Sequence, residues 1–385
     1  MRKIIYIANT RMPTEMAHGL NIMKTCEAFA KNGIEVELIV PMRFSISELG
    51  GKNPFDYYKV ERVFKVKKIF CLDLTPLNRF LGPVSYLIQA ISFSLFASFY
   101  LLFRPACRRG KKTDIVYSRD AISLVFIGFL KKNIVFEIHE IHRILFEIIL
   151  GRVKKIVVIS KGLKEDLIKK GINSDKILLA PDAIALSDFD IKENQAECRR
   201  KLGLPIDKKL VLYAGHLYKW KGVETLVLSS KFLNDDILIV VVGGIKWYLT
   251  NFKNFIRKNH LKNILILGHQ DYSQIAYYLK AADCLVLTGT EKSKISREYT
   301  SPLKMFQYMA SSRPIIASDL PSFREILNQN NAFLVKPDNP EALAEGIKLL
   351  LSDSNLAVKI STRAYQDVQK YTWDNRAKET IKFML

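Results

Sequence analysis

The chain has 385 residues, of which 49% are apolar, and a formal net charge of +21. This length exceeds what one hydrophobic core usually serves, so two domains of roughly 150 to 200 residues are expected. The positive charge favours a polyanionic partner, which could be nucleic acid, an anionic membrane or a phosphorylated substrate.

The cysteines limit the class of protein further, because they are odd in number and scattered without metal-ligand spacing. They are Cys26, Cys71, Cys107, Cys198 and Cys284. This usage favours free thiols in a reducing compartment and the absence of a structural zinc site. The chain enters a strand pattern within its first eight residues, so no cleavable signal peptide is expected.

The first half of the chain alternates between strand and helix patterns. Lys3–Ala8 is typical of a buried parallel strand, Asn21–Asn32 has a helical pattern that Gly33 ends, and Glu35–Val40 predicts the next strand. This is a βαβ unit. Further strands are predicted at 114–117, 134–138, 155–159 and 176–180.

One segment of the first half, residues 81–103, departs from this alternation because it carries no charge. Its length would span a bilayer. Pro83, Gln89 and several serines dilute it, and a span here would separate strands that must pair. Three interpretations stay open: a membrane span, a helix lying in the membrane interface, and a buried domain helix. The basic residues that follow favour anionic lipid, and they are Arg104, Arg108, Arg109, Lys111 and Lys112.

The second half repeats the alternation. Strands are predicted at 210–214, 237–242, 264–267, 284–287 and 314–317, with helical segments between them. Two successive α/β domains with parallel sheets follow from this pattern. The first domain is predicted at 1–186 and the second at 187–370, with the polar stretch 187–200 as the linker.

A glycine-bounded basic loop follows the first strand of the second domain. In Ala214-Gly-His-Leu-Tyr-Lys-Trp-Lys-Gly222 a strand ends at Gly215, and Lys221 and Gly222 open a helix. Cations between a strand end and a helix start are typical of phosphate sites in α/β domains. The alternative is a solvated surface for Lys219 and Lys221 and an ordinary loop position for His216.

The stretch Ser-Pro-Leu-Lys-Met-Phe-Gln-Tyr-Met-Ala, residues 301–310, predicts a second helix start of this kind. Ser301 is a favoured cap, and Pro302 is tolerated at the first helical position because its missing N–H would be unpaired there. The helix N-terminus and Lys304 together suit a bound phosphate. The alternative is an ordinary capped helix.

Two features of the first domain stand where a substrate could reach them. His139 follows the strand 134–138, so it could donate a hydrogen bond to a substrate, although a structural histidine is the more common role of such a residue. Gly19, in a predicted loop after the first strand, permits close backbone approach.

Taken in order, the motifs of this chain resemble glycosyltransferase family 4, whose members are retaining enzymes with the GT-B fold. The resemblance is carried by Val158-Ile-Ser160, Pro181-Asp182, Ala214–Gly222, Val242-Gly-Gly244, Leu267-Gly268, Ala282-Asp283, Ser301–Ala310, Arg313-Pro314 and Ala317-Ser-Asp319. It covers most of the chain and is loosest between about residues 41 and 130, where acceptor-binding parts diverge. No motif is specific alone, but their order is.

The resemblance implies two Rossmann-like domains with parallel sheets that face each other across a cleft, and a final helix, residues 371–385, that crosses back to the first domain. A nucleotide-sugar would lie in the cleft, with Lys221 at its diphosphate and His139 near the transferred sugar. The donor-binding residues by this resemblance are Gly19, Gly215, His216, Lys221, Thr300, Ser301, Pro302, Leu303, Lys304 and Gln307.

The chain departs from the family pattern at three positions. His216 stands where the family often has an arginine, which leaves the diphosphate to Lys221 and Lys304. The two glutamates of the family fall on Tyr299 and Gln307, and Glu298 is one place from the first of them. A glutamine can still hydrogen-bond a ribose hydroxyl, but without charge assistance. The expected catalytic set is therefore His139, Lys221 and Glu298.

The chemistry expected from these residues is transfer without a metal, and the resemblance implies that it proceeds with retention. Lysines and a helix N-terminus can stabilise a departing diphosphate. No Asp-x-Asp motif stands at the end of a predicted strand, and no cofactor is expected beside the nucleotide-sugar. The resemblance implies a hexosyltransferase-type enzyme, and the uncharged segment and its basic flank predict that it acts on the cytoplasmic face of the membrane. Its acceptor would be lipid-linked or a glycan, in polysaccharide or lipopolysaccharide biosynthesis.

Two rival functions were weighed against this one. A degenerate family member could bind a nucleotide-sugar or glycan without catalysis, because both family glutamates are replaced. A nucleic-acid-binding protein is suggested by the charge alone, and its expected basic and aromatic face or known module is missing from the sequence pattern. Nucleic acid is therefore not an expected partner.

Overall fold

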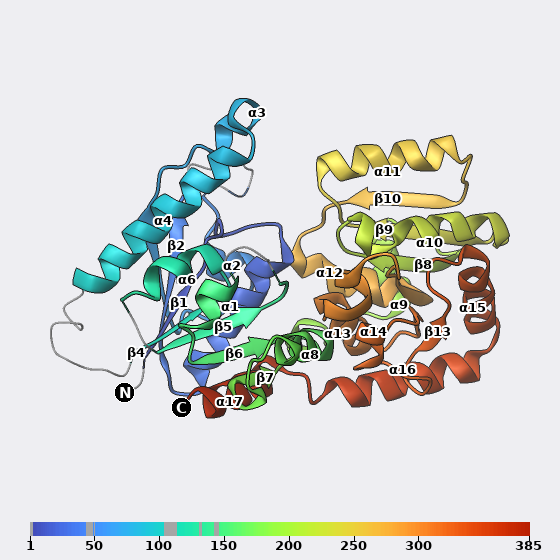
Figure 1. The fold of residues 1–385 in the computed structure, drawn as a ribbon. Helices are drawn as coiled ribbons and strands as arrows, with labels where there is room; N and C mark the ends of the chain where they lie inside the picture. Colours follow the sequence, from blue (N-terminus) through green and yellow to red (C-terminus); the bar gives the residue numbers. More distant parts are fainter. Residues whose placement is uncertain (1–2, 44–48, 50, 104–113, 131–132, 142–145) are drawn as a thin grey trace. The chain divides into compact units, whose positions relative to one another are not determined.

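The computed structural model describes residues 3–43, 49, 51–103, 114–130, 133–141 and 146–385, and the chain divides into two compact units (Figure 1). The N-terminal unit comprises Met1–Ile159, Leu163–Ala180 and Trp373–Leu385, and the C-terminal unit comprises Ser160–Gly162 and Pro181–Thr372. The divisions lie a few residues from the expected domain ends, 186 and 370. Each unit is a Rossmann-like domain with one parallel sheet, so the predicted fold class is confirmed.

The N-terminal unit is built on a seven-stranded parallel sheet with the order β3-β2-β1-β4-β5-β6-β7. Its strands are β1 (Lys3–Ile7), β2 (Glu35–Met42), β3 (Lys65–Phe70), β4 (Asp114–Ser118), β5 (Ile134–Ile138), β6 (Lys155–Val158) and β7 (Ile177–Leu179). In the central pairings Tyr6 lies opposite Leu38 on one side and Tyr117 on the other. Strands buried on both faces explain the continuous apolar runs of β1 and β2.

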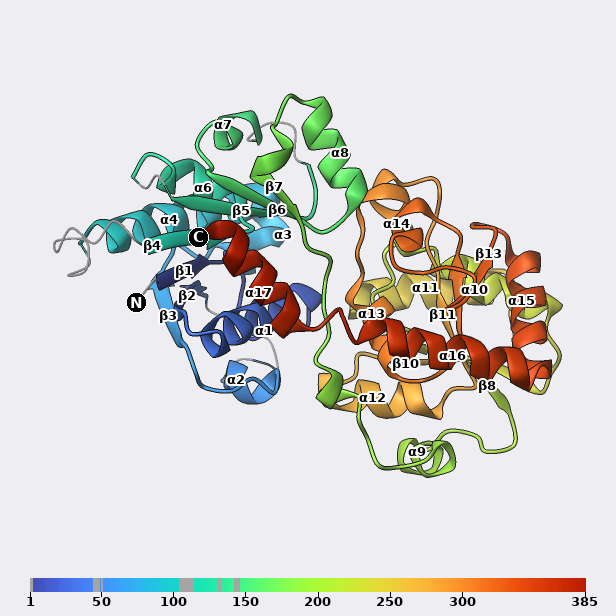
Figure 2. The same cartoon turned by 90° about the horizontal axis from the view of Figure 1, so that it is seen from below.

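Helices connect these strands. They are α1 (Ala17–Lys31), α2 (Pro54–Tyr57), α3 (Asn78–Leu81), α4 (Pro83–Phe103), α6 (Ala121–Ile127), α7 (Phe146–Leu150) and α8 (Lys161–Lys169). The last helix of the chain, α17 (Trp373–Met384), packs against α1 (Figure 2). The N-terminal unit is therefore completed by residues from the end of the sequence.

The C-terminal unit has a six-stranded parallel sheet with the order β10-β9-β8-β11-β12-β13. Its strands are β8 (Lys209–Ala214), β9 (Ile237–Val242), β10 (Ile264–Gly268), β11 (Cys284–Leu287), β12 (Ile315–Ser318) and β13 (Phe333–Val335). Its helices are α9 (Gln195–Leu202), α10 (Val223–Ser229), α11 (Lys246–Lys258), α12 (Tyr272–Ala281), α13 (Leu303–Ala310), α14 (Pro321–Arg324), α15 (Pro340–Ser352) and α16 (Ser354–Val368). Leu212 and Tyr213 of β8 belong to two separate apolar clusters. The sheet is thus buried on both faces.

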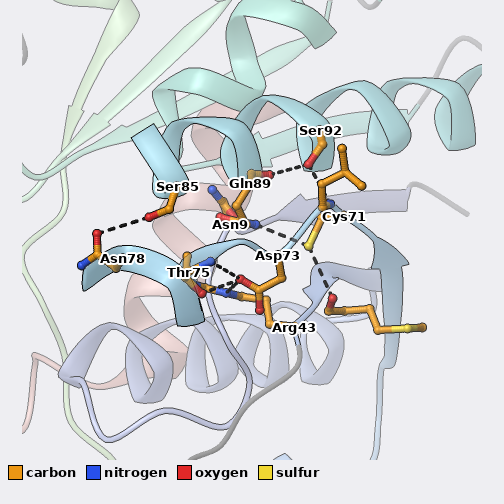
Figure 3. A network of polar contacts seen from close by, with 11 residues as sticks. Asn9, Arg43, Cys71, Asp73, Thr75, Asn78, Ser85, Gln89 and Ser92 are labelled. Atoms are coloured by element: carbon orange, nitrogen blue, oxygen red, sulfur yellow. Dashed lines mark hydrogen bonds and ion pairs between the residues drawn. The ribbon is translucent and has the colours of Figure 1, made fainter. Parts of the chain in front are cut away.

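The helix α4 has its polar residues on the buried side. Ser85, Gln89 and Ser94 are fully buried, and Gln89 donates to the side chain of Asn9 at 2.8 Å (Figure 3). Ser92 accepts a hydrogen bond from the backbone of Leu72 at 2.9 Å. The opposite side exposes Val84, Tyr86, Leu87, Leu95, Phe96, Phe99, Leu102 and Phe103. A soluble-protein helix usually has the reverse arrangement.

By length and composition α4 could cross a bilayer, but 44% of its most apolar 18-residue window is buried inside the unit. Burial of one side fits two of the three interpretations, a domain helix and a helix in the membrane interface. The basic residues predicted to flank it, 104–113, lie outside the described residues, as does Cys107. The other four cysteines are free and buried.

Two sequence-based boundaries are wrong. The predicted linker 187–200 contains the start of α9, where Asn194 and Glu197 form a reciprocal capping box. Helix α1 begins at Ala17 rather than Asn21. In both cases a polar or small residue was taken for a loop, although it is buried or capping in the fold.

Candidate functional site

The end of β8 and the turn after it form one side of the candidate site in the C-terminal unit. Gly215 has φ +146°, and a Cβ there would lie 3.6 Å from the side chain of Lys304. The neighbouring Gly243, φ +110°, would place a Cβ 2.5 Å from the carbonyl oxygen of Gly215. Glycine is therefore needed at Gly243, where a side chain would collide with backbone, and is favoured at Gly215 by the positive φ.

Lys221 is held by its backbone in the turn before α10. Thr288 donates from its hydroxyl to the carbonyl oxygen of Lys221 at 2.7 Å. Gly222 has φ +63°, and a Cβ there would lie 2.8 Å from the carbonyl oxygen of Gly289. The Lys221 ammonium lies 3.7 Å from the centre of the Trp220 ring. The predicted opening of a helix at Lys221 and Gly222 is confirmed in outline, since α10 begins at Val223.

Helix α13 forms the other side, and its start differs from the prediction. Pro302 occupies the cap position, no side chain caps the helix, and its first residue is Leu303. The hydroxyl of Ser301 instead accepts the backbone N–H of Asp182 at 3.1 Å. The interpretation of Ser301 as the cap is therefore wrong. Tyr308 accepts the backbone N–H of Ala214 at 2.7 Å, which ties α13 to the end of β8.

Two lysines near one another give the site its charge. Lys304 is 8% exposed, and among the described residues its ammonium has no hydrogen-bond partner. It lies 3.8 Å from the centre of the Tyr213 ring. Burial and the charge of Lys221 hold the pKa of Lys304 well below its usual range. Burial also lowers the pKa of Lys221 to about 7, against the opposing effect of Asp182. An anion between the two ammonium groups would supply the missing charge.

Aromatic rings line the loop between Gly215 and Lys221. The rings of His216 and Tyr218 stack with centres 5.3 Å apart, and those of Tyr218 and Trp220 lie nearly parallel at 6.3 Å. Tyr213 donates from its hydroxyl to the carbonyl oxygen of His216 at 2.8 Å. The ring of His216 thus belongs to a loop ordered by stacking.

The positions expected to replace the family's acids lie on either side of Ser301. Glu298 is in a π-helical turn, Ile295–Tyr299, where its carboxylate contacts Arg297 at 2.8 Å and Lys294 at 3.7 Å. Tyr299 and Thr300 are buried, and Gln307 is half-buried on α13, one turn after Lys304. The C-terminal unit therefore brings Lys221, Lys304 and the start of α13 together. Glu298 instead forms ion pairs with the nearby Lys294 and Arg297.

The remaining predicted residues, Gly19 and His139, belong to the N-terminal unit. Gly19 lies in the first turn of α1, not in a loop as predicted, and a Cβ there would lie 2.1 Å from the hydroxyl of Tyr58. Packing by Tyr58 thus already requires a glycine. His139 follows β5, and its Nε2 lies 2.7 Å from Oε1 of Glu137.

The contacts of four residues were missed from the sequence: Glu137, Asp182, Tyr308, and Arg376 of α17, whose guanidinium lies 3.2 Å from Oε2 of Glu137. Glu137 had a usable signal, because it lies two residues before His139 in a strand and so on the same face. The others act through contacts distant in sequence, for which a single sequence offers no pattern.

The described residues contain no group of three or more His, Cys, Asp or Glu side chains that could hold a metal ion. The Asp-x-Asp triplet Asp188-Phe-Asp190 lies between β7 and α9, and Asp188 accepts the hydroxyl of Tyr272 at 2.8 Å.

Comparison with known proteins points to one family. Residues 194–367 match the family described as "Glycosyl transferases group 1". By this match, and by the relatives described next, the chain is similar to group 1 glycosyltransferases. The family match covers most of the C-terminal unit, which contains both lysines.

Two curated relatives illustrate this similarity. An uncharacterized glycosyltransferase of Methanocaldococcus jannaschii is 28% identical over 59% of this chain and 58% of its own length. The O-antigen chain mannosyltransferase RfbU of Salmonella typhimurium is 22% identical over 72% of this chain and 75% of its own length. The chain spans 54% to 58% of the length of the first curated relatives it matches. The curated relatives that this chain resembles are therefore glycosyltransferases by name, and others among them are named for teichuronic acid and colanic acid biosynthesis.

Solved structures of other proteins have a similar fold. The crystal structure of HepE from Anabaena in complex with UDP and glucose superposes with a TM-score of 0.76 and 14% identity, over 99% of both chains. At that identity the likeness concerns the fold alone, which is the GT-B fold of two Rossmann-like domains.

Proposed function

We propose that this protein is a retaining glycosyltransferase that moves a sugar from a nucleotide-sugar to a lipid-linked or polysaccharide acceptor, without a metal ion, at the cytoplasmic face of the membrane. One observation carries the proposal: Lys221 and Lys304 both lie at the carboxyl edge of the C-terminal sheet, near enough for the charge of Lys221 to lower the pKa of Lys304. Ligands of open α/β sheets bind at this edge.

The donor diphosphate fits these lysines because it carries the opposite charge. Its phosphates would lie between the two ammonium groups and the start of α13, with backbone from Thr300 to Leu303 beside them. Gly215 leaves room for a close approach, and His216 and Gln307 would contact the rest of the donor. HepE, whose solved complex contains UDP, supports a uridine nucleotide as the first donor to try.

The proposed mechanism follows from where charge develops. As the bond between sugar and diphosphate breaks, negative charge grows on the leaving oxygen, and the two lysines are already in place to stabilise it. His139 would lie near the transferred sugar and Gly19 beside donor and acceptor. Glu298 is the remaining acid of the proposed set, and its carboxylate contacts Arg297 and Lys294.

A membrane location is supported by the exposed face of α4. Phe99 and Phe103 stack at 6.4 Å on the outside of the unit and are 55% and 68% exposed. The edge strand β3 contacts α4 through Phe70 and Phe96, and exposes Lys65, Lys67 and Lys68. An apolar face beside a row of lysines is the composition that binds anionic bilayers.

The donor proposal is tested by release of nucleoside diphosphate from UDP-, GDP- and ADP-sugars, with and without membrane lipid extract. Lys221→Met should abolish release, and Lys219→Met, in the same turn but exposed, should leave it unchanged. Release that is equal in both variants would contradict the assignment of Lys221.

The membrane proposal is tested with phosphatidylcholine vesicles, with and without phosphatidylglycerol. The double variant Phe99→Ser, Phe103→Ser should bind anionic vesicles at least about tenfold more weakly, since each buried phenylalanine contributes about 1.5 to 3 kcal/mol. Val358→Ser, an exposed apolar residue of the other unit, is the matched control. Equal binding of all three proteins would contradict docking through α4.

The alternative function is nucleotide-sugar binding without catalysis, favoured by Gln307 in place of the family's second glutamate. The variant Gln307→Glu discriminates between them. Donor binding without turnover in the natural protein, and turnover gained in the variant, would support the binding-only function. Turnover already present in the natural protein would contradict it.

A further inference from the structure

A fully buried carboxylate lies behind His139 in the N-terminal unit. Glu137 is the last residue but one of β5 and is 0% exposed. Its two oxygens have different partners. Oε1 contacts Nε2 of His139 at 2.7 Å, while Oε2 contacts the guanidinium of Arg376 at 3.2 Å and accepts the hydroxyl of Tyr117.

Arg376 comes from the opposite end of the sequence. It lies on α17, four residues after Thr372, where the C-terminal unit ends. Its side chain is 5% exposed, and it also donates to the backbone carbonyl of Ala180 at 3.4 Å. Asp374, in the first turn of α17, accepts from the side chain of Asn32 at 2.8 Å. The helix is thus fixed to the N-terminal unit around the buried ion pair.

The charge of Glu137 is set by these neighbours. Burial alone would raise its pKa, but Arg376, the hydrogen bond and charge of His139, and Arg119 outweigh burial and hold the pKa well below its usual range. The other titratable groups facing it, Tyr117, Tyr6 and Cys26, are buried and have raised pKa values, so they stay neutral. Glu137 is therefore an acceptor on both oxygens.

We infer that Glu137, fixed by Arg376 of α17, is a positioning residue that holds His139 in one tautomer and one orientation for sugar transfer. An ionised carboxylate can only accept, so Nε2 of the imidazole must carry the proton that points at Glu137. In the neutral ring the lone pair then lies on Nδ1. The inference rests on the proposed role of His139, and it makes α17 part of the catalytic apparatus rather than a fold-closing helix alone.

The arrangement explains why Arg376 must be present. Without a cation, a buried carboxylate would protonate, and its O–H would then donate to the imidazole nitrogen and select the other tautomer. Arg376 prevents this because it favours the ionised form.

The test uses the full chain with two substitution sets. Arg376→Met alone leaves a buried carboxylate unpaired, so it can fail to fold. The double variant Glu137→Gln, Arg376→Met removes both charges together and is the better-tolerated change. Arg363→Met, an exposed arginine of α16 paired with Asp367, is the matched control for the loss of an ion-paired arginine.

Three readouts are measured: nucleotide-sugar affinity, the kcat of transfer, and the 15N chemical shifts of the His139 ring, assigned with His139→Ala. In the natural protein, at a pH where the ring is neutral, we expect one tautomer, protonated at Nε2. In the double variant we expect mixed tautomers and a kcat at least about tenfold lower, with donor affinity within about twofold, because the donor lysines belong to the other unit.

Retention of the single tautomer and of kcat in the double variant would overturn the inference. Loss of donor affinity in Lys221→Met with normal ring shifts would bear on the donor site alone and would leave the inference intact. If His139→Ala leaves kcat unchanged, the proposed role of His139 fails and the catalytic part of the inference fails with it. The ring shifts then decide only whether Glu137 fixes the tautomer.

Discussion

Donor binding should take up protons, because Lys221 has a pKa near neutrality before an anion arrives. With a pKa of about 7, its side chain is about nine-tenths neutral at pH 8 and about one-tenth neutral at pH 6. A bound diphosphate favours the ammonium form and raises the pKa again. Binding at pH 8 should therefore take up at least about 0.9 proton per donor, and Lys304 adds to this in the same direction.

The same pKa predicts the direction in which donor affinity changes with pH. Without donor, Lys221 is protonated below its pKa of about 7 and loses the proton above it. Donor affinity should therefore be highest at low pH. Between pH 6 and pH 8 the contribution of Lys221 should weaken binding about tenfold, or about 1.4 kcal/mol. Because a nucleotide-sugar has no monoester phosphate, whose second pKa is about 6, the donor itself does not change charge in this range.

Isothermal titration in buffers of different ionisation enthalpy measures both quantities at once. The ratio of the Kd of Lys221→Met to that of the natural protein should shrink about tenfold from pH 6 to pH 8, because the natural protein loses its advantage as Lys221 deprotonates. Lys219→Met should show no such trend. An affinity that is independent of pH over this range, with no proton uptake, would refute the placement of a desolvated lysine at the diphosphate.

Three further predictions concern the parts of the fold that hold the two sites. Tyr308→Phe removes the acceptor of the Ala214 N–H and should lower the free energy of unfolding by about 1 to 3 kcal/mol in urea titration, with weaker donor binding. Gly243→Ala should destabilise by more than about 1 kcal/mol in the same assay, since its Cβ would meet backbone at a positive φ. Arg376→Met should cost about 3 to 5 kcal/mol near neutral pH. Because the pKa of Glu137 is lowered, this contribution is present above about pH 4.5 and is progressively lost on acidification. The thermal unfolding temperatures of the variant and the natural protein should therefore converge at low pH. A difference in unfolding temperature that stays constant with pH would contradict this.

The fold class could be predicted because most strands are continuous apolar runs. Such runs are typical of strands in a sheet that is buried on both faces. Strands β3 and β13 were missed for the opposite reason. In β3 three of six residues are lysines on an exposed edge, and β13 has only three residues. Edge strands lack the burial that produces an apolar run.

The candidate site was predicted where local pattern and function coincide. Lys221 stands in a turn that glycine fixes, and Lys304 follows a proline near a helix start, so both were found. The use of Ser301 was not, because its hydroxyl binds the backbone of Asp182, and that contact depends on how distant segments meet. Glu137 was passed over although His139 stands two residues after it, because its other charged partner, Arg376, lies at the opposite end of the sequence.

The contact between Glu137 and Arg376 also bears on how the chain is made. A ribosome produces the N-terminal unit first, then the whole C-terminal unit, and only afterwards the residues of α17. Until then the nascent N-terminal unit contains a carboxylate without its cation, so its sheet can collapse early but cannot reach its final stability. The stretch made after the C-terminal unit is thus the one that completes the first domain, and a nascent chain halted before residue 376 should remain more susceptible to protease in β5 than a chain that includes α17.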